Sequence, residues 1–152
     1  MVLNDAPAKV FIRNRSFIDL HVRPGYDSEE RARARARVMQ GWYRQQLKTL
    51  IPPLLQRWEK ALNVQAADWA IKKMKTKWGT CNTEARRIRL NLELIKKPAQ
   101  CLEYLIVHEL VHLVERHHND RFIALMDRHL PNWRQYRQEL NAAPLAHDTW
   151  TY

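Results

Sequence analysis

The chain has 152 residues, of which 45% are hydrophobic and 28% are charged. This composition is typical of one soluble globular domain and excludes an intrinsically disordered chain. No run approaches the roughly 20 apolar residues of a membrane-spanning helix, and residues 1–11 lack the order of a signal peptide, so we expect a cytoplasmic protein.

The charge and the cysteines of the chain indicate which partners and which thiol chemistry to expect. The net charge is +10, yet residues 98–152 hold 5 basic and 7 acidic residues, so the basic excess lies in the earlier part of the chain. Such an excess attracts polyanions, which makes nucleic acid a partner to consider. Cys81 and Cys101 form no CxxC pair. We therefore expect two reduced structural thiols rather than a disulfide framework.

The N-terminal part combines a short β region with a helical stretch. Residues 10–23 hold β-compatible runs, among which Phe17–Val22 is the strongest strand candidate. Pro24-Gly25 ends this strand. Asp27 followed by Glu30 three residues later has the spacing of a capping box, which predicts a helix start.

A long amphipathic pattern follows this helix start. Apolar residues recur at steps of three or four from Ala32 to Leu62, which is the helical period. Pro52-Pro53 interrupts the pattern, because a proline removes a hydrogen-bond donor and clashes with the preceding turn. We therefore expect two helices, over about residues 28–50 and 53–62.

Two further strands are expected in the middle of the chain. Trp69–Lys75 and Ile88–Asn91 have β-compatible composition. Trp78–Asn82 lies between them and reads as a turn-rich link. The pattern favours an antiparallel hairpin.

The next helix is expected to be buried. Pro98 suits the first turn of a helix, and Cys101–Val114 is apolar almost all round. The polar residues in this stretch therefore need an explanation, because burying an unpaired polar group costs roughly 2–7 kcal/mol. They are His108, Glu109 and His112.

These three residues have the order H-E-x-x-H. Two histidines four residues apart in a helix lie one turn apart on one face, about 6 Å along the axis. Both imidazoles can then reach one tetrahedral zinc ion at about 2.0–2.1 Å. Glu109 is offset from that face, where it can contact a water bound to the metal. The pattern predicts a zinc site with His108 and His112 as ligands and Glu109 as general base.

A third ligand is required, and three residues are candidates. His118 lies six residues beyond His112, so the chain must turn within the polar stretch Arg116–Asp120 to bring it back. His117 and Glu115 are the alternatives. Ligand reach favours His118.

The same polar stretch precedes another helix, from Phe122 through Leu130, which Asn119 or Asp120 can cap. Three protein ligands leave the fourth metal position to water, which is the catalytic pattern. Tyr136 and His129 are candidates for stabilising the oxyanion, although either can equally be structural.

Together these motifs resemble the YgjP-like metallopeptidase domain, a family related to SprT-like and minimal zincin peptidases. The resemblance rests on Lys75–Cys81, Ile88–Leu94, Pro98, His108–His112 and His117–Phe122. It implies an α+β, zincin-like fold with N-terminal helices, a small antiparallel sheet over the buried HExxH helix, and C-terminal helices. It also implies that residues 1–152 form a single domain, with residues 1–27 as the remnant of an N-terminal β region.

The resemblance further assigns roles to residues. His118 falls at the position of the family's last histidine and is implied as the third ligand, while His117 and Asn119 replace the family's usual Asn and Ser. The Trp78–Cys81 stretch would form either a substrate-facing wall or a purely structural turn with a buried Trp and a turn Gly. The strand at Ala70–Lys75 is a candidate for pairing with an extended peptide.

The leading hypothesis is a zinc-dependent metallopeptidase that hydrolyses peptide bonds through a metal-activated water, with a peptide or protein as substrate. The alternatives are a zinc hydrolase of another bond, and a non-catalytic, zinc-stabilised module that binds nucleic acid or protein. Glu109 distinguishes these classes, because a structural zinc site has no use for a carboxylate beside two of its ligands.

Overall fold

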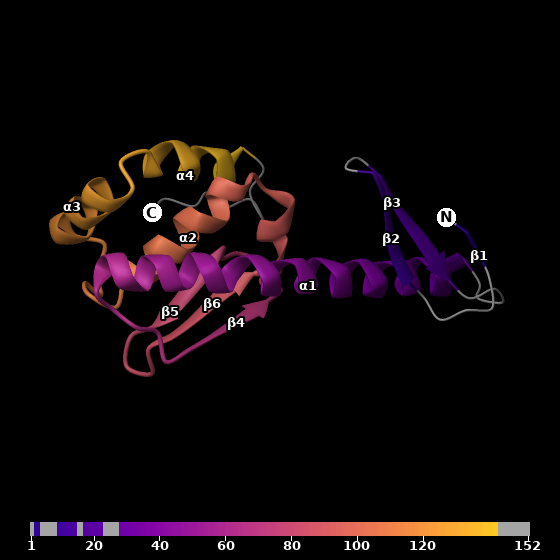
Figure 1. Ribbon diagram of the computed structural model, residues 1–152, viewed down its shortest axis with the longest axis horizontal. Helices are drawn as coiled ribbons and strands as arrows, with labels where there is room; N and C mark the ends of the chain where they lie inside the picture. Colours follow the sequence, from indigo (N-terminus) through magenta and orange to yellow (C-terminus); the bar gives the residue numbers. More distant parts are fainter. Residues whose placement is uncertain (1, 4–8, 15–16, 23–27, 143–152) are drawn as a thin grey trace. The chain divides into compact units, whose positions relative to one another are not determined.

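The computed structural model describes residues 2–3, 9–14, 17–22 and 28–142. The chain divides into two compact units, Met1–Gln46 and Leu47–Tyr152. Helix α1 (Ser28–Leu62) begins in the first unit and ends in the second (Figure 1). None of the helices in the described part of the chain is long and apolar enough to cross a membrane.

The first unit contains a small sheet with the order β1-β3-β2. Strands β2 (Lys9–Asn14) and β3 (Phe17–Val22) pair antiparallel, and β1 (Val2–Leu3) pairs parallel with β3. The strand predicted over Phe17–Val22 is confirmed. Pro24-Gly25 and the capping residue Asp27 lie outside the described residues.

Helix α1 is a single helix, so the predicted division at Pro52-Pro53 is wrong. Two prolines in a helix cost several kcal/mol, at about 3 kcal/mol each. Burial of a side chain of this size contributes about 1.5–3 kcal/mol. The helix places four such side chains on one buried face, at steps of three or four residues, and these are Leu47, Ile51, Leu55 and Trp58.

The two prolines also leave few backbone groups without a partner. The helical hydrogen bonds that the prolines remove would end on the carbonyls of Lys48 and Thr49, and both residues are exposed. Water can therefore bond to these carbonyls. Tertiary packing on one face and solvent on the other allow the helix to continue through the proline pair.

The second unit holds a mixed sheet with the order β4-β6-β5. Strand β6 (Arg87–Asn91) lies in the centre, antiparallel to β5 (Gly79–Asn82) and parallel to β4 (Asp68–Lys72). The sequence predicted that β4 and β6 form an antiparallel hairpin and that the whole sheet is antiparallel. Both predictions are wrong, because β4 and β6 pair parallel. The stretch expected as a turn-rich link instead supplies the third strand.

A buried asparagine explains this topology. The Asn91 Nδ2 donates to the carbonyls of Met74 at 2.9 Å and Lys77 at 2.6 Å, and its Oδ1 accepts from Glu93 N at 3.0 Å. Asn91 ends the central strand and is fully buried. Its side chain therefore holds the loop that carries the chain past the end of β6, from one edge of the sheet to the other.

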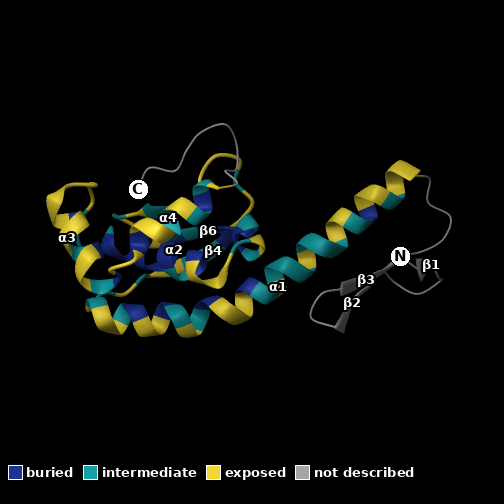
Figure 2. Cartoon of the chain, turned by 90° about the horizontal axis from the view of Figure 1, so that it is seen from above, coloured by how far each residue is buried: buried dark blue, intermediate teal, exposed yellow. Residues whose placement is uncertain are grey.

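Helix α2 (Ala99–Val111) is the core of the second unit. It contacts β5 and β6 of the sheet and also α3 (Asp120–His129) and α4 (Trp133–Asn141), and it follows a short 3₁₀ helix, η1 (Leu92–Lys96). Figure 2 shows α2 mostly dark blue, in contrast to the exposed outer faces of α1 and α3. The α+β class is confirmed, and so is the burial of the H-E-x-x-H helix.

Replacing Pro53, which is exposed, by Ala tests whether α1 tolerates the prolines or requires them. Ala restores a backbone donor and relieves a clash, while the unfolded chain regains some freedom. We expect the free energy of unfolding to rise by about 1–2 kcal/mol, measured by urea denaturation.

The exposed Pro131 lies outside the helices and provides the control. Pro131→Ala should not stabilise the protein, because only the loss of chain stiffness remains. A destabilised Pro53→Ala variant would show that the packing of α1 depends on the proline.

Candidate active site

The helix that carries the motif ends at the second histidine, His112. Helix α2 ends at Val111, His112 is its C-cap, and a turn follows in which Val114 N donates to Val111 O at 2.9 Å. The predicted helix to Val114 therefore ends three residues early. This early turn lets His118 return to the motif, which a continued helix would prevent.

The structure brings three imidazoles together. The ligand atoms of His108, His112 and His118 all lie within 4.8 Å of one another. The Nε2 atoms of His108 and His118 are 3.3 Å apart, and the ring centroids of His112 and His118 are 4.5 Å apart. Among the described residues this is the one cluster of His, Cys, Asp and Glu with the spacing of a metal site.

The two other candidate ligands remain outside this cluster. The Glu115 carboxylate is used within the loop, where its Oε1 accepts from His117 N at 3.3 Å and from Asn119 Nδ2 at 3.0 Å. Its Oε2 lies 3.6 Å from the Arg121 guanidinium. His117 is exposed beside the cluster.

Backbone carbonyls orient the His112 ring. Its Nδ1 lies 3.0 Å from the carbonyl oxygen of Arg116 and 3.3 Å from that of Glu115. A carbonyl only accepts, so Nδ1 carries the hydrogen and Nε2 keeps its lone pair. This is the usual arrangement for a metal-ligating histidine.

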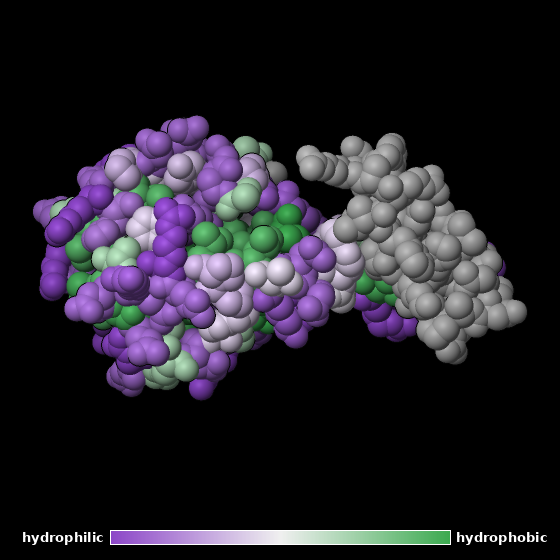
Figure 3. All heavy atoms as spheres, viewed as in Figure 1, coloured by the Kyte–Doolittle hydropathy of each residue, from purple (hydrophilic) through white to green (hydrophobic). Residues whose placement is uncertain are grey.

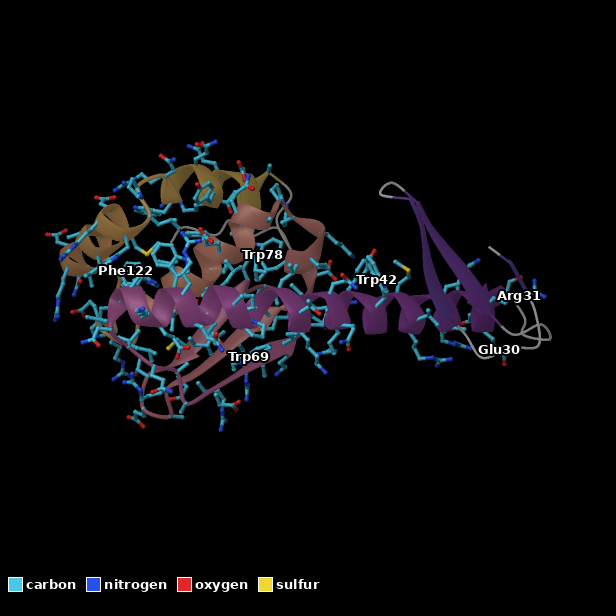
Figure 4. The ribbon with its side chains drawn as sticks, in the orientation of Figure 1. Glu30, Arg31, Trp42, Trp69, Trp78 and Phe122 are labelled. Atoms are coloured by element: carbon cyan, nitrogen blue, oxygen red, sulfur yellow. The ribbon has the colours of Figure 1, made fainter. Side chains whose placement is uncertain are left out.

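Phe122 supports all three imidazoles at once. Its ring centroid lies 4.9 Å from His108, 4.7 Å from His112 and 4.9 Å from His118. Asn119 caps α3 by accepting from Phe122 N at 3.1 Å, as predicted, and this places the aromatic ring at the start of the helix (Figure 4). The sequence indicated the cap but not the contact with the histidines.

Glu109 is almost fully buried beside His108, with its Oε1 3.9 Å from the His108 Nε2. Its Oε2 has no hydrogen-bond partner in the described structure. Gly79 of β5 lies against it, since a Cβ at this position would stand 3.2 Å from Glu109 Oε1 and 3.1 Å from Leu105 Cδ1. Absence of a side chain at Gly79 therefore allows the strand to approach the carboxylate.

Burial dominates the electrostatics of the site. It raises the pKa of Glu109 to about 8, an effect that the charge of Lys77 opposes. It lowers the pKa of His118 to about 4, with the neighbouring histidines adding to the effect, and it also lowers the pKa of His108 and of His112. The imidazoles are therefore neutral at pH 7 and can donate their lone pairs to a cation.

The three histidines and Glu109 line an open cleft of about 710 Å³. Residues 79–84, from strand β5 and the turn after it, line the cleft too. The Gly79–Cys81 part of the expected wall thus lines the cleft, whereas Trp78 is buried and does not line it. Strand β4, which was expected to pair with a peptide, lies at the opposite edge of the sheet.

Several residues singled out in the sequence have no place in this cleft. Neither Tyr136 nor His129 lines it, so the candidates for oxyanion stabilisation are not supported. Cys101 is buried and distant from the histidines along α2, whereas Cys81 lines the cleft. Burial, helped by the charge of Glu109, raises the pKa of Cys81 to about 12, so its thiol stays protonated.

The residues present fit a divalent metal ion. Three neutral imidazole nitrogens converge, one side of the cluster faces a cleft, and a carboxylate oxygen without a partner is buried next to them. Imidazole is a common ligand of divalent transition metals. Three protein ligands with an open fourth position are the arrangement of a catalytic rather than a structural site.

Two solved structures share the fold. The metallopeptidase zymogen abylysin of Pyrococcus abyssi matches with a TM-score of 0.55 and 18% identity, over 59% of this chain and 90% of that one. The metallopeptidase zymogen jannalysin of Methanocaldococcus jannaschii matches with a TM-score of 0.51 and 20% identity, over 58% and 90% of the respective chains. No curated protein is significantly similar in sequence.

The cluster of three histidines and a match to a metallopeptidase family together define a metal-dependent peptidase. Residues 8–143 match the family described as YgjP-like, metallopeptidase domain. The chain belongs to this family, and the resemblance noted in its motifs is confirmed.

Gly79→Ala tests the close approach of β5 to Glu109. The added methyl would stand 3.1–3.3 Å from Leu105 and Glu109 atoms, so the carboxylate or the strand must move. We expect peptidase kcat/KM to fall by about tenfold and the free energy of unfolding to fall by about 1–3 kcal/mol. Kinetics and urea denaturation measure the two effects.

Gly41 gives a matched control, because a Cβ there meets nothing within 4 Å. Gly41→Ala should keep full activity and stabilise α1 by up to about 1 kcal/mol. Equal activity of the two variants would contradict the role assigned to the strand contact.

Proposed function

We propose that this protein is a zinc-dependent metallopeptidase in which His108, His112 and His118 hold the metal and Glu109 is the general base. One observation carries the proposal: three imidazole nitrogens within 4.8 Å of one another line an open cleft. The buried carboxylate beside them supports a hydrolytic rather than a structural role, because a closed structural site does not need it.

The spacing of the histidines supports zinc. Two nitrogens that each lie about 2.0–2.1 Å from a tetrahedral zinc ion are about 3.3–3.4 Å apart. The Nε2 atoms of His108 and His118 are 3.3 Å apart. The contact of His112 Nδ1 with the Arg116 carbonyl leaves Nε2 as the ligand atom of this residue.

The chemistry follows from the environment of Glu109. A zinc ion at this site would act as a Lewis acid on the scissile carbonyl and would acidify a water molecule. Glu109 accepts the proton of the attacking water through the Oε2 atom that has no other partner, and it then passes a proton to the leaving amine. Its nearly complete burial keeps this carboxylate away from bulk water and in one place.

The free edge of β5 supports an extended peptide as substrate. In the described sheet β5 pairs only with β6, so its other edge keeps backbone donors and acceptors available along the cleft. A peptide that adds as a further strand would bond to this edge and pass over the histidines. The proposal thus moves the expected peptide-pairing strand from residues 70–75 to residues 79–82.

Metal analysis of His118→Ala and His117→Ala tests the ligand set. Loss of one of three ligands should reduce zinc affinity at least tenfold, whereas removal of the exposed neighbour should leave zinc content unchanged. Zinc is measured per protein after dialysis, with a competing chelator to obtain the affinity. Loss of zinc only in His117→Ala would overturn the assignment of His118.

Glu109→Gln tests the general base. The amide keeps the shape of the side chain but cannot accept the proton, so zinc should remain bound and turnover should fall by about 10²–10⁴. Cleavage of a quenched peptide library by the zinc-loaded protein gives the rate. Glu84→Gln, which changes an exposed carboxylate at the cleft wall, is the control and should retain turnover of a neutral peptide. Equal turnover in Glu109→Gln and the unchanged protein would show that another group is the base.

A further inference from the structure

Lys77 lies at the point where the chain enters the cleft wall. It lines the cleft together with Gly79 and Glu109. Its carbonyl accepts from the Asn91 side chain at 2.6 Å, and the carbonyl of the following buried residue, Trp78, accepts from Asn91 N at 2.9 Å. The backbone at Lys77 is therefore fixed by the same buried asparagine that sets the sheet topology.

The side chain of Lys77 is exposed and lines the cleft. Among the described residues, no carboxylate oxygen lies within 4.0 Å of its ammonium group, although other basic residues of this unit form such pairs, for example Arg87 with Asp68 and Lys96 with Glu93. The acidic residue on which its charge acts is the buried Glu109. A cation in this position faces the space where a substrate must lie.

The other charged side chains of the cleft are of both signs. Arg116 and Glu84 both line it and carry opposite charges. Glu109 faces the three histidines, where a divalent cation would outweigh its single negative charge. Lys77 is thus the basic side chain of the cleft that lies on the same stretch as Gly79, whose backbone approaches Glu109. Figure 3 shows hydrophilic side chains over much of the visible face of this unit. Polarity alone therefore does not distinguish Lys77, but its place in the cleft does.

We propose that Lys77 determines specificity by binding a carboxylate of the substrate, close to the scissile bond. This inference rests on the proposed peptidase function and names the class of peptide that the site prefers. Lys77 precedes Gly79 by two residues, which is at most about 7 Å of chain, and Gly79 contacts Glu109. A lysine side chain from this point reaches a substrate group within about two residues of the bond that is cleaved.

The carboxylate can belong to an Asp or Glu side chain or to the C-terminus of the peptide. Two sets of internally quenched peptides separate these sources. In the first set the C-terminus is amidated, and one position next to the cleavage site is Asp, Asn or Lys. In the second set this position is Asn, and the C-terminus is either free or amidated.

The measured quantity is the ratio of kcat/KM for the acidic peptide to that for its neutral counterpart. Lys77→Gln should lower this ratio about fivefold, the size expected of an ion pair that stays in contact with water. Lys77→Glu should shift the preference further, towards the Lys peptide. The ratio removes any general effect of the substitution on Glu109, because both substrates are cleaved by the same variant.

Lys75 provides a matched control, since it is exposed in the same loop but does not line the cleft. Lys75→Gln should keep the ratio of the unchanged protein. A ratio that is the same in Lys77→Gln as in the unchanged protein, for both peptide sets, would overturn the inference. Equal losses in the Lys77 and Lys75 variants would do so as well, because they would indicate only a general attraction by surface charge.

A binding measurement separates this inference from the proposed function. Zinc-loaded Glu109→Gln binds fluorescently labelled acidic and neutral peptides without turnover, and anisotropy gives the two affinities. Adding Lys77→Gln should reduce the preference for the acidic peptide about fivefold. Failure of the unchanged protein to cleave any peptide would contradict the peptidase proposal, whereas an unchanged binding preference would contradict the role of Lys77.

Discussion

The structure depends on one constraint, which is the placement of His108 and Glu109 in α2, and of His112 at its C-cap, among buried residues that are otherwise apolar. His108 and Glu109 are almost fully buried in α2, between the sheet on one side and α3 and α4 on the other. Such burial is costly for polar groups without partners. These buried polar groups lie on the face of α2 that borders the cleft. A cation bound there can accept the lone pairs of the imidazoles. The surrounding apolar contacts then hold the polar groups in a fixed arrangement.

Stability and function are in tension at this site. The Glu109 Oε2 atom has no partner, and burial shifts the pKa of the carboxyl to about 8. Both features weaken the folded state and both are useful in a base that must bind a proton during the reaction. Phe122 partly offsets the loss, because its buried ring packs against all three imidazoles.

The features that sequence analysis found are those set by local geometry. The spacing of His108 and His112 fixes their positions on a helix, and the polar stretch before Phe122 indicates the cap at Asn119. The β-compatible composition of Phe17–Val22 indicates a strand. The features that it missed depend on distant packing. The continuity of α1 through Pro52-Pro53 follows from the buried face of that helix, and the parallel pairing of β4 with β6 follows from the loop that Asn91 holds. Neither cause can be read from the residues next to it.

Asn91 connects the local geometry of a strand with packing between distant parts of the chain. Its backbone ends the central strand, while its side chain ties down the loop from Met74 to Lys77. Because the loop is held there, the following residues enter the sheet as β5 rather than as part of a turn, and Gly79 comes to lie against Glu109. The same anchor therefore sets the edge strand of the cleft and the place of Lys77 at the entrance. In the sequence, Asn91 looks like the polar end of a strand. In the structure, its hydrogen bonds connect the topology of the sheet with the geometry of the active site.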